Sequence, residues 1–220
     1  MNIAWAAVLT TCQGGELADE ALVDKTIDLL GELGLSAEAQ NTMRGIRNLT
    51  ARTQSVAARL ALVRALAQES GVYAFDQSLP LTWKEKKPLS GLGYDALGAP
   101  CLSDGTATIS LAHCDGMAVA ACADRNVRIG VDAERIDRPL ARRDDIAKRF
   151  FSPAEWALWE NNGRQMIDFL RIWTRKEALG KARGTGLRAD VTALDTLTVS
   201  SEHFSEHMIG EIMITLCVIE

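Results

Sequence analysis

Apolar residues recur every three or four positions in several stretches of the chain, which is the spacing of a helix with one buried face. We predict helices over residues 17–33, 52–70 and 166–183, with a shorter one starting after Ser36. Gly34 and Gly71 are expected to end the first two, because glycine is common just past a helix C-terminus. The segment Ser152-Pro153-Ala154-Glu155 predicts another helix start, with Ser152 as the N-cap of a capping box.

Shorter apolar runs with β-branched residues predict strands, at residues 3–9, 106–111, 117–123, 127–136, 197–200 and 212–219. Asp124-Arg125-Asn126 is typical of a hairpin turn, so the strands on either side of it are expected to pair. Helices and strands are grouped rather than alternating, which favours an α+β fold.

Residues 78–103 are rich in proline and glycine, which predicts a long irregular connection between two halves of the chain. We therefore predict an N-terminal half of residues 1–97 and a C-terminal half of residues 98–220.

Composition excludes several classes of protein. The 220 residues carry a net charge of −5, whereas nucleic-acid binders usually have a basic excess. The five cysteines are scattered and form no Cys-x-x-Cys pair, which disfavours a disulfide framework or a structural zinc site and favours a reducing cytoplasm. No apolar run is long enough to cross a bilayer, so we expect a cytoplasmic protein without a membrane partner.

Candidate chemistry lies on the helix predicted at 166–183. Trp173, Glu177 and Lys181 are four residues apart and share one helical face. An aromatic, a carboxylate and an ammonium in one row differ from an ordinary core stripe. The simplest interpretation is a packed tryptophan beside a surface Glu177–Lys181 ion pair, worth a few tenths of a kcal/mol.

A second candidate is the acidic pair Asp132 and Glu134, which point to the same side of a predicted strand. Neighbouring carboxylates repel, and oxygen ligands at this spacing suit Mg²⁺, although a solvent-facing acidic strand is an equally good interpretation. Adding Glu177 makes three carboxylates, and Lys181 adds a cation able to hold a phosphate oxygen. His113 is a further candidate phosphate contact, although a lone histidine is more often structural.

Four motifs in order along the chain resemble the 4′-phosphopantetheinyl transferases, specifically the surfactin-synthetase type. They are Ser110-Leu111-Ala112-His113, Gly130-Val131-Asp132-Ala133-Glu134, Phe151-Ser152-Pro153-Ala154-Glu155, and Trp173 through Lys181 to Gly184-Thr185-Gly186-Leu187. The clear match covers residues 98–190.

The resemblance implies two similar α+β halves, arranged as a pseudo-dimer with the active site between them. It implies transfer of the 4′-phosphopantetheine arm of coenzyme A (CoA) to a serine of an apo carrier protein, releasing adenosine 3′,5′-bisphosphate. In this chain Asp132, Glu134 and Glu177 would hold Mg²⁺, and Glu177 and Lys181 would be catalytic. His113, Lys176 and Lys181 would contact CoA.

The chain departs from the family pattern at two positions. Ala112 stands where a serine is common, and Ala99 replaces a basic residue in Gly98-Ala99-Pro100. The 3′-phosphate of CoA would then depend on other cations, with Arg52, Arg59, Lys86 and Lys87 as the candidates. The same departures would also suit a carrier- or CoA-binding module that has lost catalysis. A different Mg²⁺-dependent phosphotransferase or hydrolase is a weaker alternative.

A local basic excess between residues 135 and 149 indicates an acidic partner. By the resemblance this would be an acyl, peptidyl or aryl carrier protein, and the enzyme would be a monomer. A solvated, salt-bridged helix is the competing interpretation. Of the neighbouring Phe150 and Phe151, at least one is expected in the core.

Overall fold

The computed structural model describes residues 2–79, 83–137, 142–188, 194–198 and 203–219. It divides the chain into two compact units, Met1–Asn126 and Val127–Glu220. Both units combine helices with mainly antiparallel sheets, which confirms the α+β class, while the pseudo-dimer arrangement stays a prediction. No helix among the described residues is long and apolar enough to cross a membrane.

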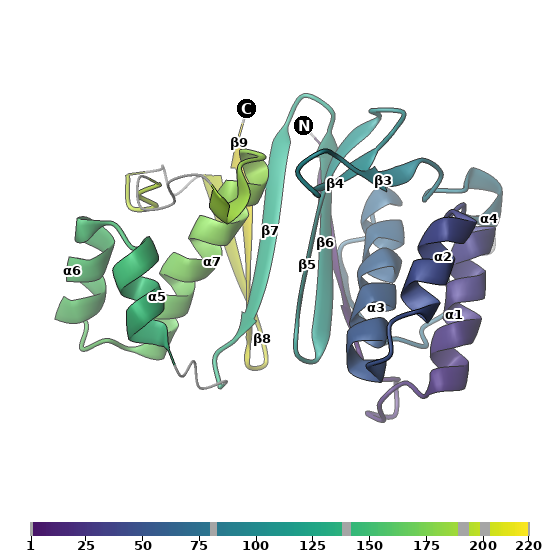
Figure 1. The fold of residues 1–220 in the computed structure, drawn as a ribbon, viewed down its shortest axis with the longest axis horizontal. Coiled ribbons are helices and arrows are strands. Elements are labelled where there is room, and N and C mark those ends of the chain that lie inside the picture. The colour runs from purple at the N-terminus through teal and green to yellow at the C-terminus, as the bar shows by residue number, and fades with distance from the viewer. Residues whose placement is uncertain (1, 80–82, 138–141, 189–193, 199–202, 220) are drawn as a thin grey trace. The chain divides into compact units, whose positions relative to one another are not determined.

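The N-terminal unit is built around a four-stranded sheet in the order β2-β1-β6-β5. Its strands are β1 (Ile3–Leu9), β2 (Gly71–Tyr73), β5 (Ala107–Cys114) and β6 (Met117–Asp124). Three helices, α1 (Glu20–Glu32), α2 (Ala37–Arg44) and α3 (Leu49–Leu66), share a core with this sheet (Figure 1). The central helix α3 packs closely on β1 and β6 because the facing residues are mostly alanines.

The connection at 78–103 is more regular than predicted. It contains the short helix α4 (Trp83–Lys86) and a small hairpin of β3 (Leu92–Tyr94) and β4 (Pro100–Leu102). The boundary between the compact units lies at 126/127 rather than at the predicted 97/98, because β5 and β6 join the sheet that begins with β1.

The predicted hairpin across residues 124–126 is wrong. Strand β6 already has β1 on one edge and β5 on the other, and β7 (Arg128–Arg135) pairs with β9 (Ile212–Ile219). The tight hairpin is instead β5–β6, where Asp115-Gly116 forms the turn and Gly116 has a φ of +91°. That Asp-Gly pair is a strong turn signal, and it predicts the hairpin that is observed.

Two helix ends also differ from prediction. Helix α3 begins after Asn48, whose side chain caps the first turn, and it ends at Leu66. Gln68 then adopts a positive φ of 62°, so the helix terminates before Gly71, which begins strand β2 instead. Gly34 follows α1 as predicted, with a φ of +99°.

The C-terminal unit contains a three-stranded antiparallel sheet in the order β7-β9-β8. Its outer strand is β8 (Phe204–Ile209) and its central strand is β9 (Ile212–Ile219). The predicted strand at 197–200 is wrong for Leu197 and Thr198, which lie in a turn. Residues 199 and 200 lie outside the described residues.

The helices of this unit are α5 (Arg143–Phe150), α6 (Pro153–Asn161) and α7 (Met166–Ala182), followed by the short 3₁₀ turn η1 (Gly186–Arg188). Helix α7 packs across β7 and β9, as Figure 1 shows. The capping box at the start of α6 is confirmed. Phe151 is buried with Trp159 and Phe169, which confirms that at least one of the two phenylalanines is in the core.

Candidate active site

A glycine lets strand β7 touch helix α7. A Cβ atom added to Gly130 would lie 1.9 Å from the carbonyl oxygen of Ala178, so only glycine allows this approach. Asp132 and Glu134 follow Gly130 on the strand, and Glu177 precedes Ala178 on the helix. The Gly-x-Asp-x-Glu spacing thus sets the acidic pair against the helix that carries Glu177 and Lys181.

Lys181 binds the strand directly. Its Nζ donates to the Asp132 carboxylate at 2.8 Å and to the Val131 carbonyl at 2.9 Å. Asp132 is only 8% exposed, so this contact keeps a buried carboxylate next to a positive charge. The surface Glu177–Lys181 pair considered from the sequence is not the ion pair that forms.

Glu177 is a half-buried carboxyl in a negative environment. Burial raises its pKa, Asp132 and Glu134 raise it further, and Lys181 opposes them, so that the pKa is about 7. A carboxyl with this pKa is half protonated near neutral pH and can exchange a proton. Asp132, Glu134, Glu177 and Lys181 therefore form one electrostatically connected group, which we call the acidic site.

The donor chemistry of the acidic site suits a hard divalent cation, because its ligating atoms would all be carboxylate oxygens. Its carboxylates are not gathered as a closed metal cluster, however. Among the residues that the structure describes, no three His, Cys, Asp or Glu side chains are arranged to hold a metal ion. The Lys181 ammonium is the cation that contacts Asp132 here.

Lys176 is buried in the C-terminal unit, whereas the family resemblance implied that it would contact CoA. Its side chain is 0% exposed, and its Nζ contacts the Glu155 carboxylate at 2.7 Å and the Leu194 carbonyl at 2.6 Å. A fully buried ammonium with these partners is not available to a phosphate arriving from solvent. The structure therefore separates Lys176 from the candidate substrate contacts. Lys176 and Glu155 both belong to the sequence motifs, but the motifs do not show that the two side chains form an ion pair.

Of the three residues in the row Trp173, Glu177 and Lys181, Trp173 has a structural role. Its ring meets Phe150 edge-on, with 5.5 Å between ring centroids, and packs against the core of the C-terminal unit. Glu177 and Lys181 continue the same face of α7 into the acidic site.

His113 belongs to the N-terminal unit, where it is exposed near the end of β5. The candidate cations of this unit differ in their surroundings. Arg52 is 7% exposed and engaged by Glu20 and Asp24, while Lys86 and Lys87 are exposed.

Arg59 lines a cavity of about 420 Å³ between α2, α3 and strand β3. It donates to the Ser55 carbonyl at 2.9 Å and to the Tyr94 hydroxyl, and it forms no ion pair with any residue that the structure describes. The lack of an ion pair among the described residues distinguishes Arg59 from Arg52 on the same helix. The cavity wall also carries Met43 and Glu38.

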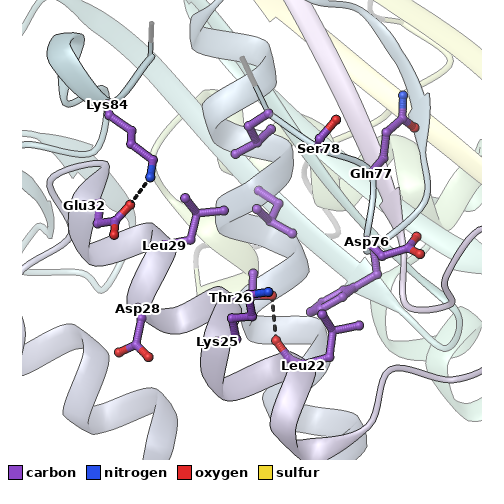
Figure 2. A pocket seen from close by; sticks show the side chains of 13 residues that line it. Leu22, Lys25, Thr26, Asp28, Leu29, Glu32, Asp76, Gln77, Ser78 and Lys84 are labelled. Carbon is purple, nitrogen blue, oxygen red and sulfur yellow. Dashed lines mark hydrogen bonds and ion pairs between the residues drawn. The ribbon is translucent and has the colours of Figure 1, made fainter. Parts of the chain in front are cut away.

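A second cavity, of about 340 Å³, lies between α1 and residues 75–79 of the same unit. Figure 2 shows an ion pair between Lys84 and Glu32 on one side of it. Asp28 and Asp76 also line it, so its charges are mixed and it has no marked preference for an anion.

Comparison with known proteins places the chain in a family. The sequence model described as "4′-phosphopantetheinyl transferase superfamily" matches residues 128–215, which include the whole acidic site. The chain is 32% identical over 133 residues to 4′-phosphopantetheinyl transferase AcpT of Salmonella typhi, covering 59% of this chain and 68% of that protein. It is 38% identical over 102 residues to 4′-phosphopantetheinyl transferase HetI of Nostoc sp., covering 43% of this chain and 41% of HetI.

A shorter similarity extends to a differently named relative. The holo-[acyl-carrier-protein] synthase of Enterobacter sp. is 39% identical over 59 residues, which are 26% of this chain and 47% of that protein. The family model covers the strand and the helix that form the acidic site, in agreement with the motifs in the sequence. The chain belongs to the 4′-phosphopantetheinyl transferase superfamily.

Proposed function

We propose that this protein transfers the 4′-phosphopantetheine arm of CoA to a serine of an apo carrier protein. Family membership supports the reaction class. The observation that carries the assignment to particular residues is Glu177, a carboxyl with a pKa near 7 between two other carboxylates and a lysine. By the family resemblance, the enzyme would be of the surfactin-synthetase type, cytoplasmic and monomeric.

In the proposed reaction, the serine hydroxyl of the carrier attacks the phosphorus that bears the pantetheine arm. The bond from that phosphorus to the bridging pyrophosphate oxygen breaks, and adenosine 3′,5′-bisphosphate leaves with the electron pair. By the family resemblance, Glu177 accepts the serine proton as a general base. Lys181 stabilises the negative charge that develops on the leaving phosphate.

Asp132, Glu134 and Glu177 are the side chains that would hold Mg²⁺. When bound, this ion supplies positive charge to the pyrophosphate. Loss of a proton from Glu177 and exchange of the Lys181 contact at Asp132 would accompany its binding, since both carboxylates are otherwise balanced by a proton or an ammonium.

Among the candidate cations Arg52, Arg59, Lys86 and Lys87, Arg59 is the one that we propose for the 3′-phosphate of CoA. Ala99 removes the basic residue that the family often uses, and Arg59 is a cavity-lining cation without an acidic partner among the described residues. We expect Arg59→Gln to raise the KM for CoA while leaving the KM for dephospho-CoA almost unchanged. An equal effect on both substrates would place the 3′-phosphate elsewhere.

Intact-mass analysis of apo carrier proteins tests the whole proposal. Acyl, peptidyl and aryl carriers, all acidic, would be incubated with CoA, Mg²⁺ and the protein, and the phosphopantetheine mass should appear on at least one carrier. Glu177→Gln should abolish the mass gain, whereas Glu211→Gln, an exposed carboxylate of the same unit, should retain it. No transfer by the folded wild-type protein to any carrier would contradict the proposal.

The departures at Ala99 and Ala112 favour one alternative, a module that binds CoA or a carrier without catalysis. Calorimetry with CoA distinguishes the two functions. Binding without turnover on every carrier would support the binding module, whereas Mg²⁺-dependent binding followed by transfer would support the enzyme.

A further inference from the structure

The C-terminal unit contains an ion pair that is completely removed from solvent. Lys176 and Glu155 both have 0% of their side-chain surface exposed, and Nζ lies 2.7 Å from Oε2. Burying two charges costs several kcal/mol per ion unless the remaining hydrogen-bonding positions are also satisfied. A buried pair that meets this condition therefore indicates which segments of the unit it holds together.

Every oxygen of Glu155 has protein partners. Oε1 accepts from the Thr196 backbone N–H at 2.8 Å and from its hydroxyl at 2.7 Å, and Oε2 accepts from the Ser152 N–H at 2.8 Å. Lys176 adds the contact to the Leu194 carbonyl at 2.6 Å. The pair thus joins the first turn of α6, the middle of α7 and residues 194–196.

Lys176 is adjacent in sequence to Glu177, and neighbouring residues on an α-helix point about 100° apart. The Lys176 side chain enters the buried network, whereas the Glu177 side chain lies outside it and interacts electrostatically with Asp132 and Glu134. On the following residue, Ala178, the backbone contacts Gly130 of β7. Helix α7 is consequently held by one contact on each side of Glu177, which restricts both its rotation and its translation.

We propose that the Glu155–Lys176 pair is a positioning device that sets the rotation of α7 and so aims Glu177 at the acidic site. Lys176 acts through Glu177 and does not contact CoA. This inference rests on the proposed function, since it assigns a role in the transfer reaction. It explains why two charges are retained at a buried position that an apolar pair would fill with comparable stability.

Steady-state kinetics of Lys176→Met and Glu155→Gln test the inference, with CoA as the varied substrate. Displacing a catalytic group by about 1 Å costs up to about 100-fold in rate, so we expect kcat to fall about 10- to 100-fold. Measured at saturating Mg²⁺, the KM for CoA should stay within about twofold of the wild-type value, because no contact to CoA is removed.

Two further variants keep the test decisive if these proteins do not fold. Thr196→Val removes one hydroxyl from the network but leaves the ion pair, and it should lower kcat by a smaller factor with the same unchanged KM. Thr215→Val is the matched control, because it removes a buried hydroxyl that contacts α7 at Thr174, outside the network. It should lower stability without a comparable fall in kcat.

A Lys176→Met protein with a raised KM for CoA and an unchanged kcat would overturn the inference and place Lys176 on the substrate. A wild-type kcat in folded Lys176→Met or Thr196→Val would also overturn it, leaving the pair a purely stabilising contact. Failure of the proposed function is distinguishable, because then the wild-type protein itself transfers nothing.

Discussion

Replacing Glu177 with glutamine should make the metal-free protein more stable at alkaline pH. Burial and the neighbouring Asp132 and Glu134 carboxylates raise the pKa of Glu177 from its ordinary value of 4.5 to about 7. Ionising this group in the folded protein is therefore unfavourable. Glutamine has the shape of the protonated side chain and cannot ionise, so it removes the penalty.

The sign of the pH dependence follows from proton linkage. Below about pH 4.5 the carboxyl is protonated in both the folded and the unfolded state, and the two proteins should be equally stable. Between pH 4.5 and about 7 the folded wild-type protein binds the extra proton, so its stability falls relative to the variant as pH rises. Above pH 7 the full difference, about 3 kcal/mol, should be present.

Urea denaturation in the presence of EDTA, repeated from pH 5 to pH 8.5, measures this difference. The free energy of unfolding of Glu177→Gln minus that of the wild type should grow with pH and level off near pH 8. Glu211→Gln, whose carboxylate is exposed, should run parallel to the wild type. A variant that is less stable than the wild type at pH 8, or a difference that does not change with pH, would refute the electrostatic account of the acidic site.

Two further substitutions test the packing that holds the acidic site. Gly130→Ala should destabilise the C-terminal unit by about 1–3 kcal/mol or more, because its Cβ would lie 1.9 Å from the Ala178 carbonyl; Gly93→Ala, which meets nothing within 4 Å, is the control, and equal urea midpoints would contradict the prediction. Thr174→Val should cost about 1–3 kcal/mol in urea denaturation, since it removes the 2.7 Å contact between the buried Thr174 and Thr215 hydroxyls. Adding Thr215→Val should recover part of that loss, and strictly additive losses would show that the two hydroxyls do not depend on each other.

Local features of the fold could be predicted from the sequence because their causes are local. The capping box at Ser152 and Glu155 needs only residues three apart, and the row Trp173, Glu177, Lys181 follows from the helical repeat. The alternation along β7 likewise gives Asp132 and Glu134 a common direction, and Asp132 contacts Lys181 on the helix that carries Glu177.

Strand pairing was predicted less well, because it depends on segments far apart in the chain. Asp124-Arg125-Asn126 has the residues of a hairpin turn, yet β6 pairs with β1, more than 100 residues earlier, and with β5. An apolar strand gains more by filling the centre of a sheet than by following a nearby turn signal.

For the site, the order of residues is enough to predict the acidic pair on its strand, the helical row with Glu177 and Lys181, and the family to which these motifs belong. The partner of each neighbouring charge depends on how the chain folds. Lys176 and Lys181 lie on one helix five residues apart, but Lys176 is sealed in an interior network with Glu155, while Lys181 contacts Asp132. The helical repeat sets the direction of each side chain, whereas the packing of distant segments decides whether that direction leads to the core or to the site.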